Sequence, residues 1–161
     1  LLPDYQRRTI ESAMFLRALF AFLVLPGMVA FAIPIYWLVS TSRTGLVHPL
    51  GLLPLLVGCA GLLWCVRDFY VFGKGTLAPW SPPQHLVTAG LYRYSRNPMY
   101  VSVLLIVLGW AVSFDVRGLY WYTIFVGIAF HLRVVLGEEP WLARTHGATW
   151  DDYTKRVRRW L

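Results

Sequence analysis

The sequence is poor in charged residues and in cysteine. Only 14% of its 161 residues are Asp, Glu, Lys or Arg, against about 25% in an ordinary soluble domain. So few charges cannot cover a water-facing surface, which excludes a disordered chain and most cytosolic enzymes. The two cysteines, Cys59 and Cys65, lie six residues apart in one apolar stretch. Their number and position exclude a disulfide scaffold, and they have no metal-ligand spacing.

Several common catalytic motifs are missing as well. The chain contains no P-loop, no G-x-G-x-x-G after a strand, no G-x-S-x-G nucleophile elbow and no H-E-x-x-H zinc motif. A nucleotide-like cofactor would therefore bind without a P-loop or a Rossmann domain, and no metal site is predicted.

Apolar residues are abundant: 57% of the chain is hydrophobic and 16% is aromatic, and the mean hydropathy is +0.53. Four apolar stretches approach the length of about 20 residues that a helix needs to cross a bilayer. We therefore predict an all-α integral membrane protein in a single domain, residues 1–161, with an amphipathic segment at 138–161. The predicted spans are residues 15–39, 46–66, 98–114 and 118–136.

The net charge of +7 suggests nucleic-acid binding at first sight, but its placement favours membrane topology. With four spans and a cytoplasmic amino terminus, only Arg43 and Arg117 fall on the outer side. This asymmetry follows the positive-inside rule. We predict a multi-pass protein with both termini in the cytoplasm, in contact with membrane lipids and not with nucleic acid. The eleven basic residues on the cytoplasmic side are Arg7, Arg8, Arg67, Lys74, Arg93, Arg96, Arg144, Lys155, Arg156, Arg158 and Arg159.

The loop at 67–97 and the segment after residue 136 are the two sizeable polar segments on that side, so we expect them to form a cytoplasmic pocket. Asn97 suits a helix N-cap and Pro98 the first helical position. The positive end of that helix would favour an anionic group such as a carboxylate. The faces of Tyr92 and Tyr100 suit an adenine ring or a sulfonium cation. Alternatively, Tyr and Arg side chains here are interfacial anchors.

The last span ends in a second group of polar residues. Glu138 and Glu139 are adjacent carboxylates, which are costly beside an apolar helix unless they are exposed or paired. They could instead form a solvated cap, and Arg133 could simply extend to lipid phosphates. The segment around Trp150 and Trp160 is basic and amphipathic, and we interpret it as lying on an anionic membrane surface.

These segments resemble the isoprenylcysteine carboxyl methyltransferase and phospholipid methyltransferase superfamily of integral membrane methyltransferases. The resemblance covers about residues 77–161. It rests on the order and spacing of several short motifs, which here read Gln84–Val87, Gly90–Tyr92, Arg96–Tyr100, Glu138–Leu142, His146-Gly147 and Trp150–Tyr153.

The resemblance implies an enzyme that uses S-adenosyl-L-methionine (SAM), with its pocket on the cytoplasmic side. The cofactor contacts that it implies are Gln84, His85, Leu86, Val87, Tyr92, Asn97, Pro98, Met99, Tyr100 and Glu138.

The sequence departs from the family pattern near the expected acceptor site. Isoprenylcysteine enzymes carry an Arg four residues before the Glu that matches Glu138, and it holds the substrate carboxylate. That position is Val134 here. Arg133 is its neighbour, about 100° around an α-helix. Asn97 replaces the more usual His, and Gln84 stands where the eukaryotic enzymes have His.

From these features we predict methyl transfer from SAM to a lipophilic, membrane-embedded acceptor, in the manner of isoprenylcysteine carboxyl methyltransferases. The candidate catalytic residues are Arg133, to orient an acidic acceptor, and Glu139, as a base, with His131 as a further candidate base. The alternatives are an N-methyltransferase for ethanolamine phospholipids and a non-catalytic lipid-binding membrane protein of the same fold.

Overall fold

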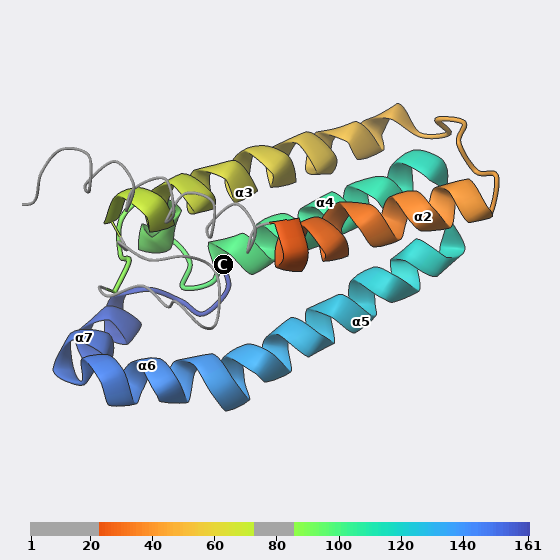
Figure 1. Ribbon diagram of the computed structural model, residues 1–161. Coiled ribbons are helices and arrows are strands. Elements are labelled where there is room, and N and C mark those ends of the chain that lie inside the picture. Colours follow the sequence, from red (N-terminus) through yellow and green to blue (C-terminus); the bar gives the residue numbers. More distant parts are fainter. Residues whose placement is uncertain (1–22, 73–85) are drawn as a thin grey trace, which may run out of the picture.

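The computed structural model describes residues 23–72 and 86–161, and every regular element in these ranges is a helix (Figure 1). The only β-type pairing there is an isolated bridge between Ser95 and Arg158. The all-α prediction is thus confirmed for the described residues. The elements are η1 (Leu23–Ala32), α2 (Ile33–Ser40), η2 (Pro49–Gly51), α3 (Leu52–Phe72), η3 (Gly90–Arg93), α4 (Pro98–Phe114), α5 (Arg117–Arg133), η4 (Val134–Glu138), α6 (Glu139–His146) and α7 (Ala148–Arg156).

Two helical stretches are long and apolar enough to cross a bilayer. One is Pro49–Phe69, and the other is Arg117–His146, in which α5, η4 and α6 form one continuous rod. Pro26–Ser40 and Pro98–Phe114 are shorter apolar helices. The described residues therefore contain two candidate membrane spans, and the crossing of the bilayer by the other two helices stays a prediction.

The helix boundaries agree with the predicted stretches to different degrees. Helix α4 occupies Pro98–Phe114, the predicted range. It begins at Pro98 because proline lacks an N–H and fits the first turn of a helix. Helix α3 begins later than expected and continues to Phe72. Its extension carries Asp68, which is fully buried and pairs with Arg67 through a contact of 3.2 Å between Nη1 and Oδ1. The first predicted stretch lies partly outside the described residues.

Helices α3 and α4 pack with their backbones in close contact. A Cβ added to Gly58 would lie 2.6 Å from the Ser102 carbonyl oxygen, and one added to Gly109 would lie 2.6 Å from the Leu55 backbone nitrogen. Small residues at helix contacts are the usual means of association between apolar helices, because they let the backbones approach. This pair of helices is the central contact of the bundle.

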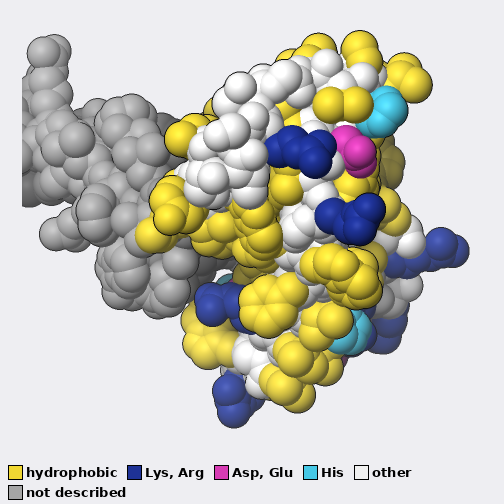
Figure 2. Space-filling view, turned by 90° about the vertical axis from the view of Figure 1, so that its right-hand side faces the viewer, with side chains coloured by type: hydrophobic (Ala, Val, Ile, Leu, Met, Phe, Trp, Pro, Cys, Tyr) yellow, Lys and Arg dark blue, Asp and Glu magenta, His cyan; other side chains and the backbone are white. Residues whose placement is uncertain are grey.

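Hydrogen bonds join η1 to α4 and to α5. The indole of Trp110 donates to the Ala30 carbonyl at 3.0 Å, and the Tyr122 hydroxyl donates to the Val29 carbonyl at 3.2 Å. The loops between α2 and α3 and between α4 and α5 lie together at one end (Figure 1). Hydrophobic side chains predominate on the face seen from that end, with scattered basic groups (Figure 2).

The opposite end of the bundle brings together segments that are distant in the sequence. Helix α3 ends there, η3 and the start of α4 follow, and the α5–α6 rod turns back through α7 (Figure 1). Cys65, Val87 and Tyr92 form a buried cluster at this end. This is where the two polar segments identified in the sequence meet.

The close approach of α3 and α4 predicts that Gly58→Leu destabilises the protein. The new side chain must displace backbone atoms of α4, which costs about 1–3 kcal/mol in an overpacked interface. Thermal unfolding in detergent measures the effect. Gly45→Leu is the control, because nothing lies within 4 Å of a Cβ at Gly45. Equal unfolding temperatures for the two variants would contradict this packing.

Candidate functional site

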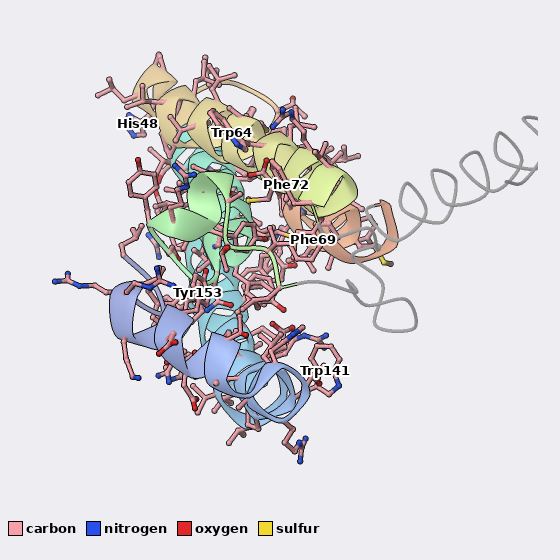
Figure 3. All side chains as sticks on the ribbon, turned by 90° about the vertical axis from the view of Figure 1, so that its left-hand side faces the viewer. His48, Trp64, Phe69, Phe72, Trp141 and Tyr153 are labelled. Carbon is pink, nitrogen blue, oxygen red and sulfur yellow. The ribbon has the colours of Figure 1, made fainter. Side chains whose placement is uncertain are left out.

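A pocket opens at the end of the bundle where α3 ends and α4 begins. Phe69 of α3 and Tyr153 of α7 approach it from different helices (Figure 3). Its walls are mostly apolar and aromatic, with a few polar groups, as in small-molecule sites. The described residues contain no cluster of metal-ligating side chains. The lining residues are Phe69, Leu86, Val87, Tyr92, Arg96, Asn97, Met99, Tyr100, Glu138, Leu142, His146, Trp150 and Tyr153.

Most of the predicted cofactor contacts meet in this one pocket. Pro98 is buried at the first position of α4 and does not line it. Gln84 and His85 lie outside the described residues. Cofactor binding by this group stays a prediction, which the shared location supports. The predicted contacts that line the pocket are Leu86, Val87, Tyr92, Asn97, Met99, Tyr100 and Glu138.

Gly90 allows the turn that carries Tyr92 to lie directly against α3. Its φ of +59° is in the left-handed region, which glycine adopts without strain. A Cβ at this position would lie 1.9 Å from Asp68 Oδ2. The buried Asp68 carboxylate thus occupies the space that the side chain of any residue other than glycine would need at position 90. The turn therefore packs directly against the end of α3.

Arg133, Glu138 and Tyr100 form a polar cluster at the edge of the pocket. Arg133 Nε donates to Glu138 Oε1 at 2.8 Å and to the Tyr100 hydroxyl at 3.1 Å. The Tyr100 hydroxyl also donates to Glu138 Oε1. The Arg133 side chain remains 54% exposed. The cluster therefore presents a partly free guanidinium group beside the predicted cofactor contacts.

A π-helical turn explains how Arg133 reaches Glu138. In an α-helix, residues five apart point about 140° away from each other. The segment Val134–Glu138 is π-helical, and its i→i+5 hydrogen bonds add about one residue to the turn. As a result, Arg133 and Glu138 lie on the same face of the helix, although they are five residues apart. In a regular α-helix, residues four apart would have this relation. Val134, which occupies the position of the family's Arg, is fully buried instead.

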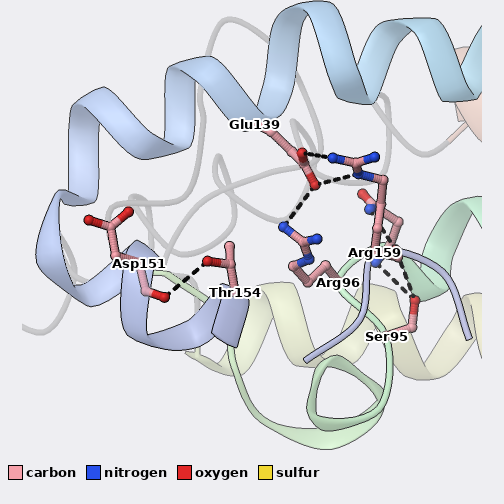
Figure 4. Close-up of polar contacts among 7 residues, drawn as sticks. Ser95, Arg96, Glu139, Asp151, Thr154 and Arg159 are labelled. Atoms are coloured by element: carbon pink, nitrogen blue, oxygen red, sulfur yellow. Dashed lines mark hydrogen bonds and ion pairs between the residues drawn. The ribbon is translucent and has the colours of Figure 1, made fainter. Parts of the chain in front are cut away.

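Glu139 binds two arginines, Arg96 and Arg159 (Figure 4). Arg159 forms a bidentate pair with it, Nε to Oε1 at 2.9 Å and Nη2 to Oε2 at 2.7 Å. Arg96 Nη1 lies 2.9 Å from Oε1. Both adjacent carboxylates are thus paired, and they do not form a solvated cap. Glu139 is not among the pocket-lining residues, and its predicted role as a base would require it to leave an ion pair.

Asn97 occupies the N-cap position of α4, but the expectation that its side chain caps the helix is wrong. Its Nδ2 donates instead to the Arg159 carbonyl at 3.0 Å, and its backbone N–H donates to Ser95 Oγ at 3.1 Å. The bond to the Arg159 carbonyl uses the Nδ2 donor and orients the amide group, while Oδ1 makes no capping bond to α4. Sequence reasoning could not foresee this partner, which is 62 residues away.

The interpretation of Trp150 as a membrane-surface anchor is wrong, because this side chain is buried in the pocket wall. Tyr153, one turn further along α7, is buried beside it, and its hydroxyl donates to the Tyr92 carbonyl at 2.7 Å. Burial raises the pKa of Tyr153 to about 12, so the phenol stays a neutral donor. The guanidinium group of Arg96 lies 5.6 Å from the centre of the Trp150 ring.

Sequence reasoning missed about half of the pocket wall. Trp150 and Tyr153 were detectable, because residues three apart share one face of a helix. Phe69 lies at the end of an apolar helix, where nothing in the sequence distinguishes it from its neighbours. The pocket residues that were not predicted as contacts are Phe69, Arg96, Leu142, His146, Trp150 and Tyr153.

Comparison with known protein families gives one match. The family model described as "Phospholipid methyltransferase" matches residues 46–149, which include α3, α4, α5 and most of the pocket wall. This family belongs to the membrane methyltransferase superfamily that the sequence motifs resemble. Searches of curated proteins and of solved structures found no match.

Proposed function

The chain belongs to the phospholipid methyltransferase family, and on this premise we propose that it transfers a methyl group from SAM to a lipophilic acceptor that enters from the bilayer. The observation that carries the proposal is the pocket. It joins the residues expected to hold the cofactor to an arginine at its edge. The apolar helices around it provide access for a membrane-embedded acceptor.

The side chains of the pocket fit the chemistry of the cofactor. SAM supplies an electrophilic methyl group on a positively charged sulfur. Aromatic faces and carboxylates favour such a cation, and the pocket offers Tyr100, Trp150 and Glu138. Leu86 and Met99 provide an apolar wall. In the proposed role these residues hold and align the donor, and such alignment lowers a methyl-transfer barrier by up to about 7–11 kcal/mol in ideal cases.

Arg133 is the residue that we propose to orient an anionic acceptor. Its Nε is occupied by Glu138 and Tyr100, which fixes the guanidinium plane. The exposed apolar residues Ile128, Leu132 and Leu136 of the same rod lie on its surface. An amphiphile with a carboxylate could therefore place its chain in the bilayer and its anion at Arg133. A carboxylate acceptor needs no general base, which agrees with the isoprenylcysteine-type reaction.

Transfer to a phospholipid amine is the alternative within the family. An ammonium acceptor must lose a proton before it attacks, so a base must lie near it. Of the candidate bases, Glu139 is bound by two arginines, and the His131 ring stacks on Trp160 with 6.0 Å between centroids. Neither lines the pocket. His146 does line the pocket, so a base for the amine reaction is available there. The exposed guanidinium group of Arg133 supports an anionic acceptor, whereas the family description supports the amine.

The proposal includes four membrane spans with the pocket and both termini in the cytoplasm. A water-soluble cofactor requires a cytoplasmic pocket, and Lys155 and Arg156 lie on α7 at that end, whereas the loops at the other end carry Arg43. Cysteine substituted at Arg43 or at Lys155 tests this topology, in variants that lack Cys59 and Cys65. In sealed cells a membrane-impermeant thiol reagent should label only the cysteine at position 43. Labelling at position 155 alone would show that the protein has the opposite orientation in the membrane.

Cofactor binding is predicted to depend on Glu138 and Tyr100. Calorimetry with S-adenosylhomocysteine on detergent-solubilised protein should show binding to the wild type. Glu138→Ala or Tyr100→Ala should raise Kd by about 10–100-fold, since a hydrogen bond to a charged group contributes about 1.5–3 kcal/mol. Asp152→Ala is the control, because that carboxylate is exposed and its ion pair within the described residues is with Lys155. Absence of wild-type binding would favour the non-catalytic lipid-binding alternative. Variants that bind like the wild type would place the cofactor elsewhere.

The acceptor class is predicted to depend on Arg133. Lipid extracts incubated with radiolabelled SAM should yield a labelled lipophile that carries a methyl ester. Arg133→Gln should raise the acceptor KM by about tenfold or more, because the anion loses its charged partner. Arg117→Gln, at the other end of α5, is the control. Label found only in the headgroup of ethanolamine phospholipids would establish the N-methylation alternative instead.

A further inference from the structure

Residues 157–160, which we call the strap, run alongside the segment that precedes α4. The Arg96 N–H donates to the Arg158 carbonyl at 2.9 Å, beside the parallel bridge between Ser95 and Arg158. The Arg159 carbonyl accepts from Asn97 Nδ2 at 3.0 Å and from Ser95 Oγ at 3.4 Å. The strap therefore adds a short strand-like pairing to the stretch that carries Arg96 and Asn97, both of which line the pocket.

The strap is also attached to the α5–α6 rod. The Arg159 guanidinium group holds both oxygens of Glu139 at the start of α6. The Trp160 ring stacks on His131 of α5, with an angle of 30° between the planes. The strap thus links the segment before α4 to the rod that carries Glu138 and Leu142. These are two different walls of the pocket.

The charges in this link are arranged around one carboxylate. Arg96 and Arg159 are like charges that would repel each other, and Glu139 lies between them with a side chain that is only 15% exposed. Hydrogen bonding to Glu139 raises the pKa of Arg159 above its already high value, so the guanidinium group stays charged. Arg96 Nε is buried without a hydrogen-bond partner in the described part of the chain. The Arg96 guanidinium group therefore depends on Glu139 and on the face of Trp150 for its position.

We propose that Arg159 is a positioning residue for the cofactor pocket. It holds Glu139, and Glu139 in turn fixes Arg96 against Trp150, while the Arg159 carbonyl fixes Asn97. The strap thereby sets the separation between the segment before α4 and the α5–α6 rod. This inference rests on the proposed function, because the pocket whose walls it sets is the proposed cofactor site. It gives Glu139 a role as the anion of this link in place of a catalytic base.

The test uses the full chain in detergent and S-adenosylhomocysteine as the probe. Calorimetry is run well below the unfolding temperature of each variant, so that a change in Kd does not reflect unfolding. Arg159→Gln should raise Kd by about tenfold, within the range of coupling between residues in one ion-pair network. Arg159→Lys keeps the charge but not the bidentate geometry, so its Kd should be intermediate. Arg158→Gln is the matched control, because that side chain is exposed; its Kd should equal that of the wild type.

A double-mutant cycle separates positioning through Glu139 from a general loss of structure. Glu139→Gln should raise Kd as much as Arg159→Gln does, and the double variant should be no weaker than either single one. If Arg159→Gln does not fold, Glu139→Gln and Arg159→Lys still give the comparison. A lower unfolding temperature with a wild-type Kd in the Arg159 variants would overturn the proposal and leave the strap as a structural attachment only. Absence of binding to the wild type would overturn the proposed function itself, and this inference with it.

Discussion

Two adjacent carboxylates at the end of a long apolar helix must find partners, and the arrangement of the site follows from how they do so. An unpaired charge beside the hydrocarbon region is costly. Glu138 turns toward Tyr100 and Arg133, and Glu139 turns toward Arg96 and Arg159. These contacts gather α4, the α5–α6 rod and the strap around one pocket. The polar network thus determines how the elements are arranged at this end of the bundle, because apolar packing alone does not specify their positions.

The sequence was sufficient to predict the features that depend on local chemistry. Composition indicated helices, the Asn97-Pro98 pair indicated where α4 begins, and the motif order indicated seven of the residues that line the pocket. Features that depend on distant partners were not predictable. The Asn97 side chain bonds to a carbonyl 62 residues away, and Trp150 is buried where α7 meets η3 and the segment before α4. Amphipathic periodicity indicates that such a helix has a hidden face, but not what covers it.

The two halves of the structure are stabilised differently. Along α3 and α4 the contact depends on small residues and on close backbones, which tolerate little added volume. At the pocket end the elements meet through side chains and through hydrogen bonds that connect single residues. A closely packed apolar body with a polar end of this kind fits the proposed function, in which a water-soluble cofactor and a lipophilic acceptor meet. In that function, the polar end would serve the water-soluble molecule and the apolar body would serve the lipophilic one.

The π-helical turn at Val134–Glu138 has a consequence for comparing related sequences. One additional residue between an arginine and the glutamate that it contacts is absorbed within a single turn, so the contact survives while the spacing changes. Counting four residues back from Glu138, as in an α-helix, leads to Val134 and overlooks the contact with Arg133. In this part of the protein, contacts in space are a sounder basis for alignment than sequence position.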